Sequence, residues 1–383
     1  MVDWRIPLYK VYSDDEDIEA VEKVIRRGSY WTTGPENEEF ERIVAEGVGA
    51  KYGVSYNSGT SALHALMVAY GFKAGDEVIV PSFTFIATAN SVLFVGARPV
   101  FADIETETFG LDPEDVSRRI TGRTKAIMPI HYGGAPCQIG SLAKIASERS
   151  IPLIEDAAES VGASVDGTKV GHFGDSAMIS FCGNKVITTG EGGMVVTDSP
   201  ELADKLRLVR SHGRLESEPY FMTTKSLDYI ALGYNWRMST ITASLGISQM
   251  RKLAKVVGMR REIARKISDR LTKFNELIVP RVFDNPFAVF QMYTIRVKEG
   301  RATRDKLRDH LKNLGIITKV YFDPVHLTEF YVQNFRGKDT RLPVTEQLSG
   351  EVLTLPIYPT MTPSEVDYLT HSVEDFFSGK PRR

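Results

Sequence analysis

Short hydrophobic runs alternate with helical patterns between residues 50 and 250 of the chain. Several runs are apolar almost throughout, which is typical of strands buried on both faces of a sheet. Between them, residues 61–72 and 141–150 carry the apolar spacing of helices. This alternation predicts an α/β fold with a mainly parallel sheet covered by helices. The predicted strands are 77–83, 98–104, 125–131, 151–157, 176–181 and 192–198.

Two features refine this architecture. The strand at 192–198 follows the strand at 176–181 too closely for a helical crossover, so we expect that pair to be antiparallel. Beyond it, residues 252–274 predict a long basic helix leading out of the sheet region. A strand at 288–297 and helices at 303–315 and near 363–377 follow. We therefore expect a large α/β domain over residues 1–250, including an N-terminal segment, and a small C-terminal α+β domain over residues 251–383.

Composition excludes several classes of protein. The 383 residues are 42% hydrophobic and 25% charged with a net charge of −2, an ordinary globular mixture without the basic runs of a nucleic-acid-binding protein. No apolar run is long enough to cross a membrane, and the opening lacks the apolar core of a secretory signal. Cys137 and Cys182 form no CxxC pair, so we expect reduced thiols and a cytoplasmic protein. The spacing of the histidines predicts no metal site.

One charged residue stands out within the small-residue stretch SFCGNKVITTGEGG (180–193), namely Lys185. A second candidate, Asp156, ends the predicted strand 151–157. Ligands of open parallel sheets bind beyond the carboxyl ends of the strands, where a carboxylate can pair with a cationic group. The alternatives for Asp156 are a helix N-cap and a surface acid.

A turn that opens a helix, YNSGTSALHAL (56–66), offers a seat for a phosphate. Exposed amides at a helix start, with the hydroxyls of Ser58 and Thr60, suit an anion. Ordinary capping by Thr60 or Ser61 is the alternative. The stretch is not a P-loop, and GEGG (190–193) does not complete a dinucleotide fingerprint, which disfavours a dehydrogenase.

An aromatic residue, Phe85 in PSFTFIAT, follows the strand at 77–83 on the same side. It could stack on a flat ligand ring or pack in the core. A ring-stacking aromatic, a phosphate seat, a strand-end acid and a lysine are together what pyridoxal phosphate requires. The lysine supplies the Schiff-base amine and later moves a proton, and the acid keeps the ring nitrogen protonated.

The motifs NSGTSALHA, PSFTFIAT, EDAAES, SFCGNKVITTGEGG and GYNWRMS occur in this order along the chain. With them, the chain resembles the DegT/DnrJ/EryC1/StrS sugar-nucleotide aminotransferases, which are pyridoxal phosphate enzymes of fold type I. The resemblance implies that Lys185 forms the Schiff base and that Asp156 pairs with the pyridine nitrogen. Some relatives carry His in place of the lysine and dehydrate their substrates, and Lys185 argues against that branch.

The resemblance also assigns the remaining cofactor contacts. Phe85 takes the ring-stacking position, and the phosphate is bound by Gly59, Thr60 and Ser180. Asn235 of GYNWRMS reaches the phosphate of the neighbouring subunit, which implies a homodimer with shared active sites.

Three further positions are less defined by the resemblance. Glu159 lies where the family places a polar residue near the cofactor's ring oxygen, and it departs from the His or Gln of many members. His212 and His326 fall where relatives line the sugar side of the site. For either histidine, the alternative is a hydrogen-bonded structural role.

Within the family, the motifs look closest to GDP-perosamine synthases. Such a resemblance implies amino transfer from L-glutamate to C4 of GDP-4-keto-6-deoxymannose. The alternatives are a 3- or 4-keto sugar on another nucleotide (dTDP or UDP), a cyclitol, and a catalytically silent relative that keeps the cofactor pocket. We expect small-molecule substrates and neither nucleic-acid nor membrane partners.

Overall fold

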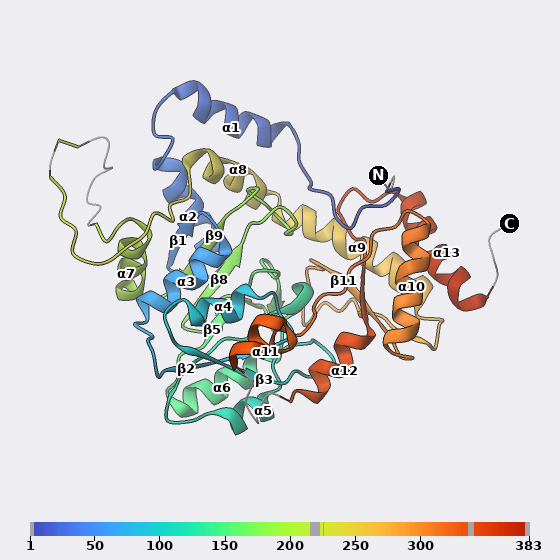
Figure 1. Cartoon of the computed structure of the whole chain (residues 1–383). Coiled ribbons are helices and arrows are strands. Elements are labelled where there is room, and N and C mark those ends of the chain that lie inside the picture. Colours follow the sequence, from blue (N-terminus) through green and yellow to red (C-terminus); the bar gives the residue numbers. More distant parts are fainter. Residues whose placement is uncertain (1–3, 215–222, 225, 336–340, 380–383) are drawn as a thin grey trace.

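The computed structural model describes residues 4–214, 223–224, 226–335 and 341–379. Its central feature is a sheet whose strands occur in the order β1-β9-β8-β5-β4-β2-β3 (Figure 1). Two isolated bridges, Ile127 to Leu153 and Ile130 to Asp156, join β4 to β5. The strands are β1 (Tyr52–Tyr56), β2 (Glu77–Pro81), β3 (Arg98–Ala102), β4 (Thr124–Ile127), β5 (Ile154–Asp156), β8 (Ser176–Ser180) and β9 (Gly193–Thr197).

One strand of the sheet, β9, runs in the opposite direction to the others. All neighbouring strands are parallel except β9, which runs antiparallel to both β1 and β8. Ser180 lies directly opposite Gly193 in this pairing, so the segment between β8 and β9 starts and ends at one position of the sheet. The prediction of a mainly parallel sheet in which the strands at 176–181 and 192–198 are antiparallel is confirmed, and the second antiparallel pair, β1 with β9, was not predicted.

Helices bury both faces of the sheet. Along β8, Met178 packs into one hydrophobic cluster, whereas its neighbours Ala177 and Ile179 pack into another on the opposite face. This alternation explains why the strands are apolar almost throughout. The first cluster includes α3 (Gly59–Ala69), α4 (Ala87–Leu93) and α7 (Pro200–Arg210), and the second includes α2 (Pro35–Val48) and α8 (Thr240–Arg251); α5 (Pro113–Arg119) and α6 (Ile139–Arg149) cover β2, β3 and β4.

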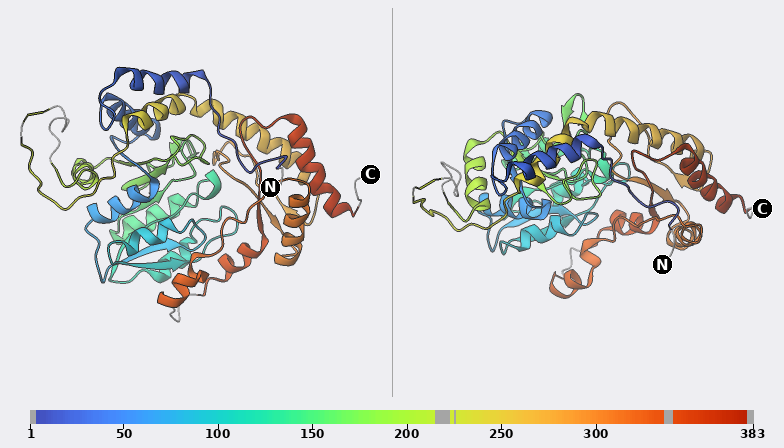
Figure 2. Two further views of the ribbon diagram at one scale, coloured as in Figure 1. Left: turned by 45° about the horizontal axis from the view of Figure 1, so that its top comes forward. Right: turned by 90° about the horizontal axis from the view of Figure 1, so that it is seen from above.

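A second, smaller sheet lies beyond the long helix α9 (Leu253–Leu271), which runs out from the large sheet in both views of Figure 2. The order of this antiparallel sheet is β10-β11-β12. A bridge from Ile6 to Ile316 brings the start of the described chain to this region. Its elements are β10 (Leu277–Ile278), β11 (Tyr293–Val297), α10 (Arg301–Asn313), β12 (Val352–Leu355) and α13 (Pro363–Ser378).

The remaining elements are peripheral or short. Helix α1 (Asp15–Arg27) packs on α8, as Figure 1 shows at the top of the molecule. Helices α11 (Glu329–Phe335) and α12 (Pro343–Glu351) connect the small sheet back toward β3 (Figure 1). The others are the hairpin β6 (Ser164–Val165) and β7 (Thr168–Lys169), and the 3-10 turns η1 (Tyr132–Gly134) and η3 (Val325–Leu327). A domain boundary near residue 250 stays a prediction.

Candidate active site

Three of the residues predicted to bind the cofactor, Asp156, Ser180 and Lys185, lie at or just beyond the carboxyl ends of two parallel strands. Asp156 ends β5 and Ser180 ends the adjacent strand β8, where Asp156 pairs with Met178. Lys185 lies five residues beyond Ser180, in the segment that connects β8 to β9. Parallel neighbours place these ends at one edge of the sheet, which is the usual position of a ligand crevice in such folds.

Asp156 is buried, with 2% of its surface exposed. The Thr88 hydroxyl donates to its Oδ2 at 2.7 Å, and the Ala158 amide donates to its Oδ1 at 3.1 Å. Burial raises the pKa of Asp156, the hydrogen bonds from Thr88 and Ala158 lower it, and the charge of Glu159 raises it. The surface-acid alternative is therefore wrong, and each oxygen keeps a lone pair for a cationic ligand.

Lys185 points into the same region, and its side chain is only 13% exposed. Its Nζ lies 3.5 Å from Oε1 of Glu159, whose Oε2 accepts a hydrogen bond from the Gly133 amide at 2.8 Å. The Lys185 ammonium also lowers the pKa of Asp156, because the two charges are close enough to attract each other. The amine and the acid are therefore both largely buried and close enough to interact electrostatically.

The start of α3 and Ser180 form the candidate phosphate seat. Ser58 caps α3, since its Oγ accepts from the Ser61 amide at 3.1 Å, and the helix begins at Gly59. The helix is thus capped by Ser58, whose hydroxyl was predicted to bind an anion, and not by Thr60 or Ser61. A β-carbon added at Gly59 would lie 3.2 Å from Ser180 Oγ, so the missing side chain allows close approach of the hydroxyl. The amides of Gly59 and Thr60 have no acceptor within the helix and suit an anion.

Phe85 lies one turn before Thr88, whose amide donates to the Phe85 carbonyl at 3.2 Å. Its ring is 60% exposed, so the core-packing alternative is wrong. An exposed aromatic ring beside the partner of Asp156 can stack on a planar ligand. The ends of these strands and the segments that follow them therefore carry an exposed aromatic ring, an acid, an amine and a candidate phosphate-binding site.

Beneath the site, the buried carboxylate of Glu155 ties strand β5 to its surroundings. Its Oε1 accepts from the amides of Phe173 at 2.7 Å and Gly174 at 2.8 Å. Its Oε2 accepts from the Gly171 amide at 2.8 Å and lies 3.0 Å from His131 Nε2. The other ring nitrogen, His131 Nδ1, accepts from a backbone amide, so the Nε2 proton points at Glu155.

Comparison with known proteins identifies the family. Residues 11–374 match the DegT/DnrJ/EryC1/StrS aminotransferase family. The chain belongs to this family. It is a pyridoxal phosphate-dependent sugar aminotransferase, so the predicted fold, enzyme class and cofactor are confirmed.

Individual relatives cover nearly the whole aminotransferase. GDP-perosamine synthase from Caulobacter vibrioides is 39% identical over 331 residues, which cover 86% of each chain. The structure of the aminotransferase TlmJ from Streptoalloteichus hindustanus has a TM-score of 0.90 at 30% identity, covering 98% of this chain and 99% of that one. Helicobacter pylori PseC, an aminotransferase of pseudoaminic acid biosynthesis, has a TM-score of 0.92 at 28% identity, with the same coverage.

Pyridoxal phosphate fits the residues present in the aminotransferase. The start of α3 with Ser180 would hold its phosphate, and Phe85 would lie against its ring. Asp156 is the buried acid for the ring nitrogen, and Lys185 is the amine within reach of Glu159. These individual assignments stay predictions.

Two predicted residues lie on the segment that leads from α7 to α8. The backbone of Asn235 pairs with Ser211 in an antiparallel bridge, and both Asn235 and His212 are exposed. The His212 amide donates to the Tyr234 carbonyl at 2.8 Å. The proposed reach of Asn235 to a second subunit and a substrate role for His212 stay predictions.

His326 is buried. Its Nδ1 lies 2.6 Å from the Ser82 hydroxyl, and its amide donates to the same oxygen at 3.0 Å. Burial lowers its pKa, which favours the neutral ring. These contacts fit the structural alternative, and a substrate-binding role for His326 stays a prediction.

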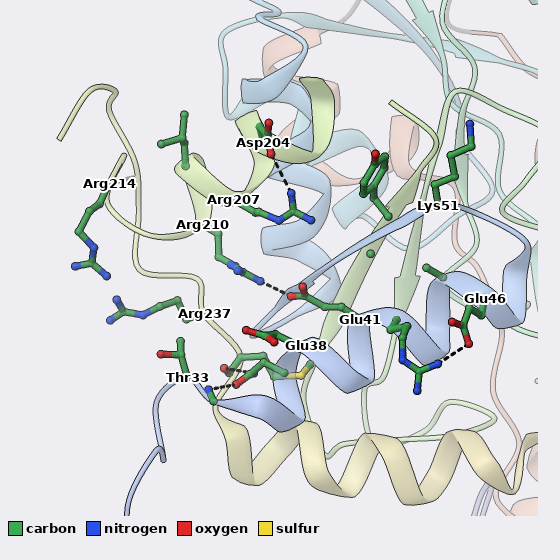
Figure 3. Close-up of a pocket in the computed structure, with 18 residues that line it drawn as sticks. Thr33, Glu38, Glu41, Glu46, Lys51, Asp204, Arg207, Arg210, Arg214 and Arg237 are labelled. Carbon is green, nitrogen blue, oxygen red and sulfur yellow. Dashed lines mark hydrogen bonds and ion pairs between the residues drawn. The ribbon is translucent and has the colours of Figure 1, made fainter. Parts of the chain in front are cut away.

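A cavity of about 910 Å³ lies elsewhere, between α2, α7 and the start of β1 (Figure 3). Its walls carry several arginines, but acids offset much of that charge. Glu41 pairs with Arg210 at 2.5 Å, and Asp204 pairs with Arg207 at 2.9 Å. None of the predicted cofactor residues lines this cavity.

Two features are absent from the described residues. They contain no cluster of three or more His, Cys, Asp or Glu side chains arranged to hold a metal ion. In the same part of the chain, every helix is too short or too polar to span a bilayer.

The structure also shows site residues that the sequence did not single out, foremost Thr88 and Glu155. Thr88 lies within the PSFTFIAT motif and Glu155 within the EDAAES motif, and these motifs were the available signals.

Proposed function

We propose that this aminotransferase moves the amino group of L-glutamate to the C4 carbonyl of GDP-4-keto-6-deoxymannose, giving GDP-perosamine. The observation that supports the chemistry is that Lys185 and Asp156 are both largely buried and close enough to interact electrostatically. The substrate assignment is supported by GDP-perosamine synthases from Caulobacter vibrioides, Escherichia coli O157:H7 and Vibrio cholerae, which are 34–39% identical over at least 86% of the chain.

Each protein group has a defined task in this proposal. When bound, pyridoxal phosphate supplies an electron sink that stabilises negative charge on a substrate carbon. Asp156 would stabilise a positive charge at the ring nitrogen. Its oxygens accept from Thr88 and Ala158, and each keeps a further lone pair that can accept from the protonated nitrogen. Lys185 provides the amine that carries the proton, and Glu159 holds that amine from the side. Ser180 and the start of α3 bind the phosphate dianion.

We further propose that a second subunit completes the site through Asn235. Its segment exposes Tyr229, Ile230 and Leu232, and Leu232 is 82% exposed. Apolar side chains grouped in this way on a surface are typical of a contact with another protein. A homodimer would bury them and bring Asn235 to the partner's phosphate seat.

The cytoplasm stays our proposed location, because Cys137 and Cys182 are both free thiols.

A substrate panel tests the proposed reaction. Purified enzyme with L-glutamate should aminate GDP-4-keto-6-deoxymannose in preference to the corresponding dTDP- and UDP-linked keto sugars, with the product position determined by NMR. Lys185→Ala is the matched inactive control. Preference for a dTDP or UDP sugar would overturn the substrate assignment and leave the aminotransferase class intact, whereas equal product with Lys185→Ala would overturn the role of Lys185.

A further inference from the structure

Two buried threonines stand in line behind Asp156. Both are almost fully buried; Thr88 lies in the first turn of α4, and Thr84 lies four residues earlier, in the segment that leads into the helix. The Thr88 hydroxyl donates to Asp156 Oδ2 at 2.7 Å, and its oxygen lies 2.8 Å from the Thr84 hydroxyl. A hydroxyl has one proton, and Thr88 gives it to the carboxylate. Thr84 must therefore donate to Thr88, which fixes the direction of the whole chain of hydrogen bonds.

This arrangement differs from what a helical hydroxyl usually does. Ser and Thr side chains in helices commonly donate to a backbone carbonyl three or four residues earlier. Ser91 of the same helix does so, with its hydroxyl 2.9 Å from the Thr88 carbonyl. The Thr88 hydroxyl donates to a carboxylate 68 residues away in sequence instead. Its bond thus serves the acid at the end of β5 and not helix α4.

The bond has two physical effects on Asp156. It fixes the rotation of the carboxylate, because Thr88 holds Oδ2 while the Ala158 amide holds Oδ1. It also opposes the effect of burial, which raises the pKa of Asp156, because a donated hydrogen bond favours the charged form. Without the hydroxyl, the Ala158 amide is the single protein donor that holds the carboxylate among the described residues.

We propose that Thr88, with Thr84 behind it, is a positioning residue that holds Asp156 charged and aimed at the cofactor's ring nitrogen. This inference rests on the proposed role of Asp156. It assigns to Thr88 a task in setting the protonation of the cofactor ring, in addition to packing. The relevant property of residue 88 is its hydroxyl group and not its shape.

The structure offers a matched control for the loss of such a bond. Thr345 is also buried, and its hydroxyl donates to the buried Asp103 at the same distance of 2.7 Å. Thr88→Val and Thr345→Val therefore each remove one hydroxyl from one buried carboxylate. Thr88→Ser keeps the hydroxyl and removes the methyl group. Thr88→Ala repeats the test if valine does not fit, and circular dichroism verifies folding.

The measurement is the ¹⁵N NMR signal of the ring nitrogen in holoenzyme loaded with ¹⁵N-labelled pyridoxal phosphate, together with the dissociation constant of the cofactor. In Thr88→Val we expect the signal to move toward that of an unprotonated ring and the dissociation constant to rise about tenfold. Thr88→Ser and Thr345→Val should both stay close to the wild type. Asp156→Asn serves as the reference for complete loss of the acid.

Each other outcome overturns a defined part of the reasoning. If Asp156→Asn shifts the nitrogen signal and Thr88→Val does not, the inference about Thr88 is wrong and the proposed function stands. Equal shifts in Thr88→Val and Thr345→Val, or in Thr88→Val and Thr88→Ser, also overturn it, because the effect would not come from this hydroxyl. If Asp156→Asn leaves the signal unchanged, the role of Asp156 in the proposed function is wrong.

Discussion

Glu155 provides the sharpest test of how the fold supports the site, because its buried carboxylate receives four donors. In Glu155→Gln, one acceptor oxygen becomes an NH₂ group of nearly the same size. If that group takes the Oε1 position, it faces the amides of Phe173 and Gly174. If it takes the Oε2 position, it faces the Gly171 amide and His131 Nε2. A tautomer change of His131 does not help, since Nδ1 already accepts from the Cys137 amide.

Two donors therefore lose their acceptor in either orientation of the glutamine. A buried donor left without a partner costs about 1–3 kcal/mol, so we expect Glu155→Gln to lower the free energy of unfolding by about 4 kcal/mol. The assay is urea unfolding of the holoenzyme, followed by circular dichroism. Glu148→Gln on the exposed face of α6 is the control and should change stability by less than about 0.5 kcal/mol. A loss below about 1 kcal/mol for Glu155→Gln would refute the assigned hydrogen bonds.

Three further predictions concern the site itself. Asn235→Ala and Lys185→Ala should each be inactive as homodimers, and a mixture should recover about a quarter of wild-type activity by forming one intact site per mixed dimer; no recovery would contradict shared sites. Burial raises the folded-state pKa of Asp156 above its ordinary value of 3.8, so wild-type apoenzyme should lose stability relative to Asp156→Asn as the pH rises from 4 through that raised pKa. Urea unfolding measures this loss, which should approach about 1.4 kcal/mol for each pH unit within that window, and a pH-independent difference between the two proteins would refute it. Phe85→Ala should weaken cofactor binding about tenfold in equilibrium dialysis without lowering the melting temperature of the apoenzyme, because the ring is exposed; unchanged binding would exclude stacking.

The strands that the sequence predicted are those whose side chains are buried on both faces. Residues 77–83 and 176–181 are apolar almost throughout, and they correspond to β2 and β8, whose residues are all buried. Strand β1 was missed, because Tyr52, Gly53 and Ser55 interrupt its hydrophobic pattern. Its place in the sheet depends on pairing with β9, more than 130 residues later, which no local pattern can show.

The residues of the candidate site also differ in how far the sequence alone could identify them. Lys185 and Asp156 could be selected as candidates from the sequence because a charged residue at a strand end or in a small-residue turn is unusual on its own. The bond from Thr88 to Asp156 could not, since it joins two elements whose meeting depends on the order of strands β2, β4 and β5. His326 was predicted to line the sugar side of the site. The sequence could not show that its ring is hydrogen-bonded to Ser82, which is far away along the chain.

The antiparallel course of β9 has a consequence for how this enzyme could be altered. Ser180 and Gly193 lie opposite each other. A β-carbon added at Gly59 would lie 3.2 Å from Ser180 Oγ, and one at Gly193 would lie 2.4 Å from the Ser58 carbonyl oxygen. The segment that carries Lys185 thus starts and ends beside the residues proposed to bind the phosphate. Protein engineers could exchange residues 181–192 between homologues as a single cassette, provided that these two anchor residues are retained.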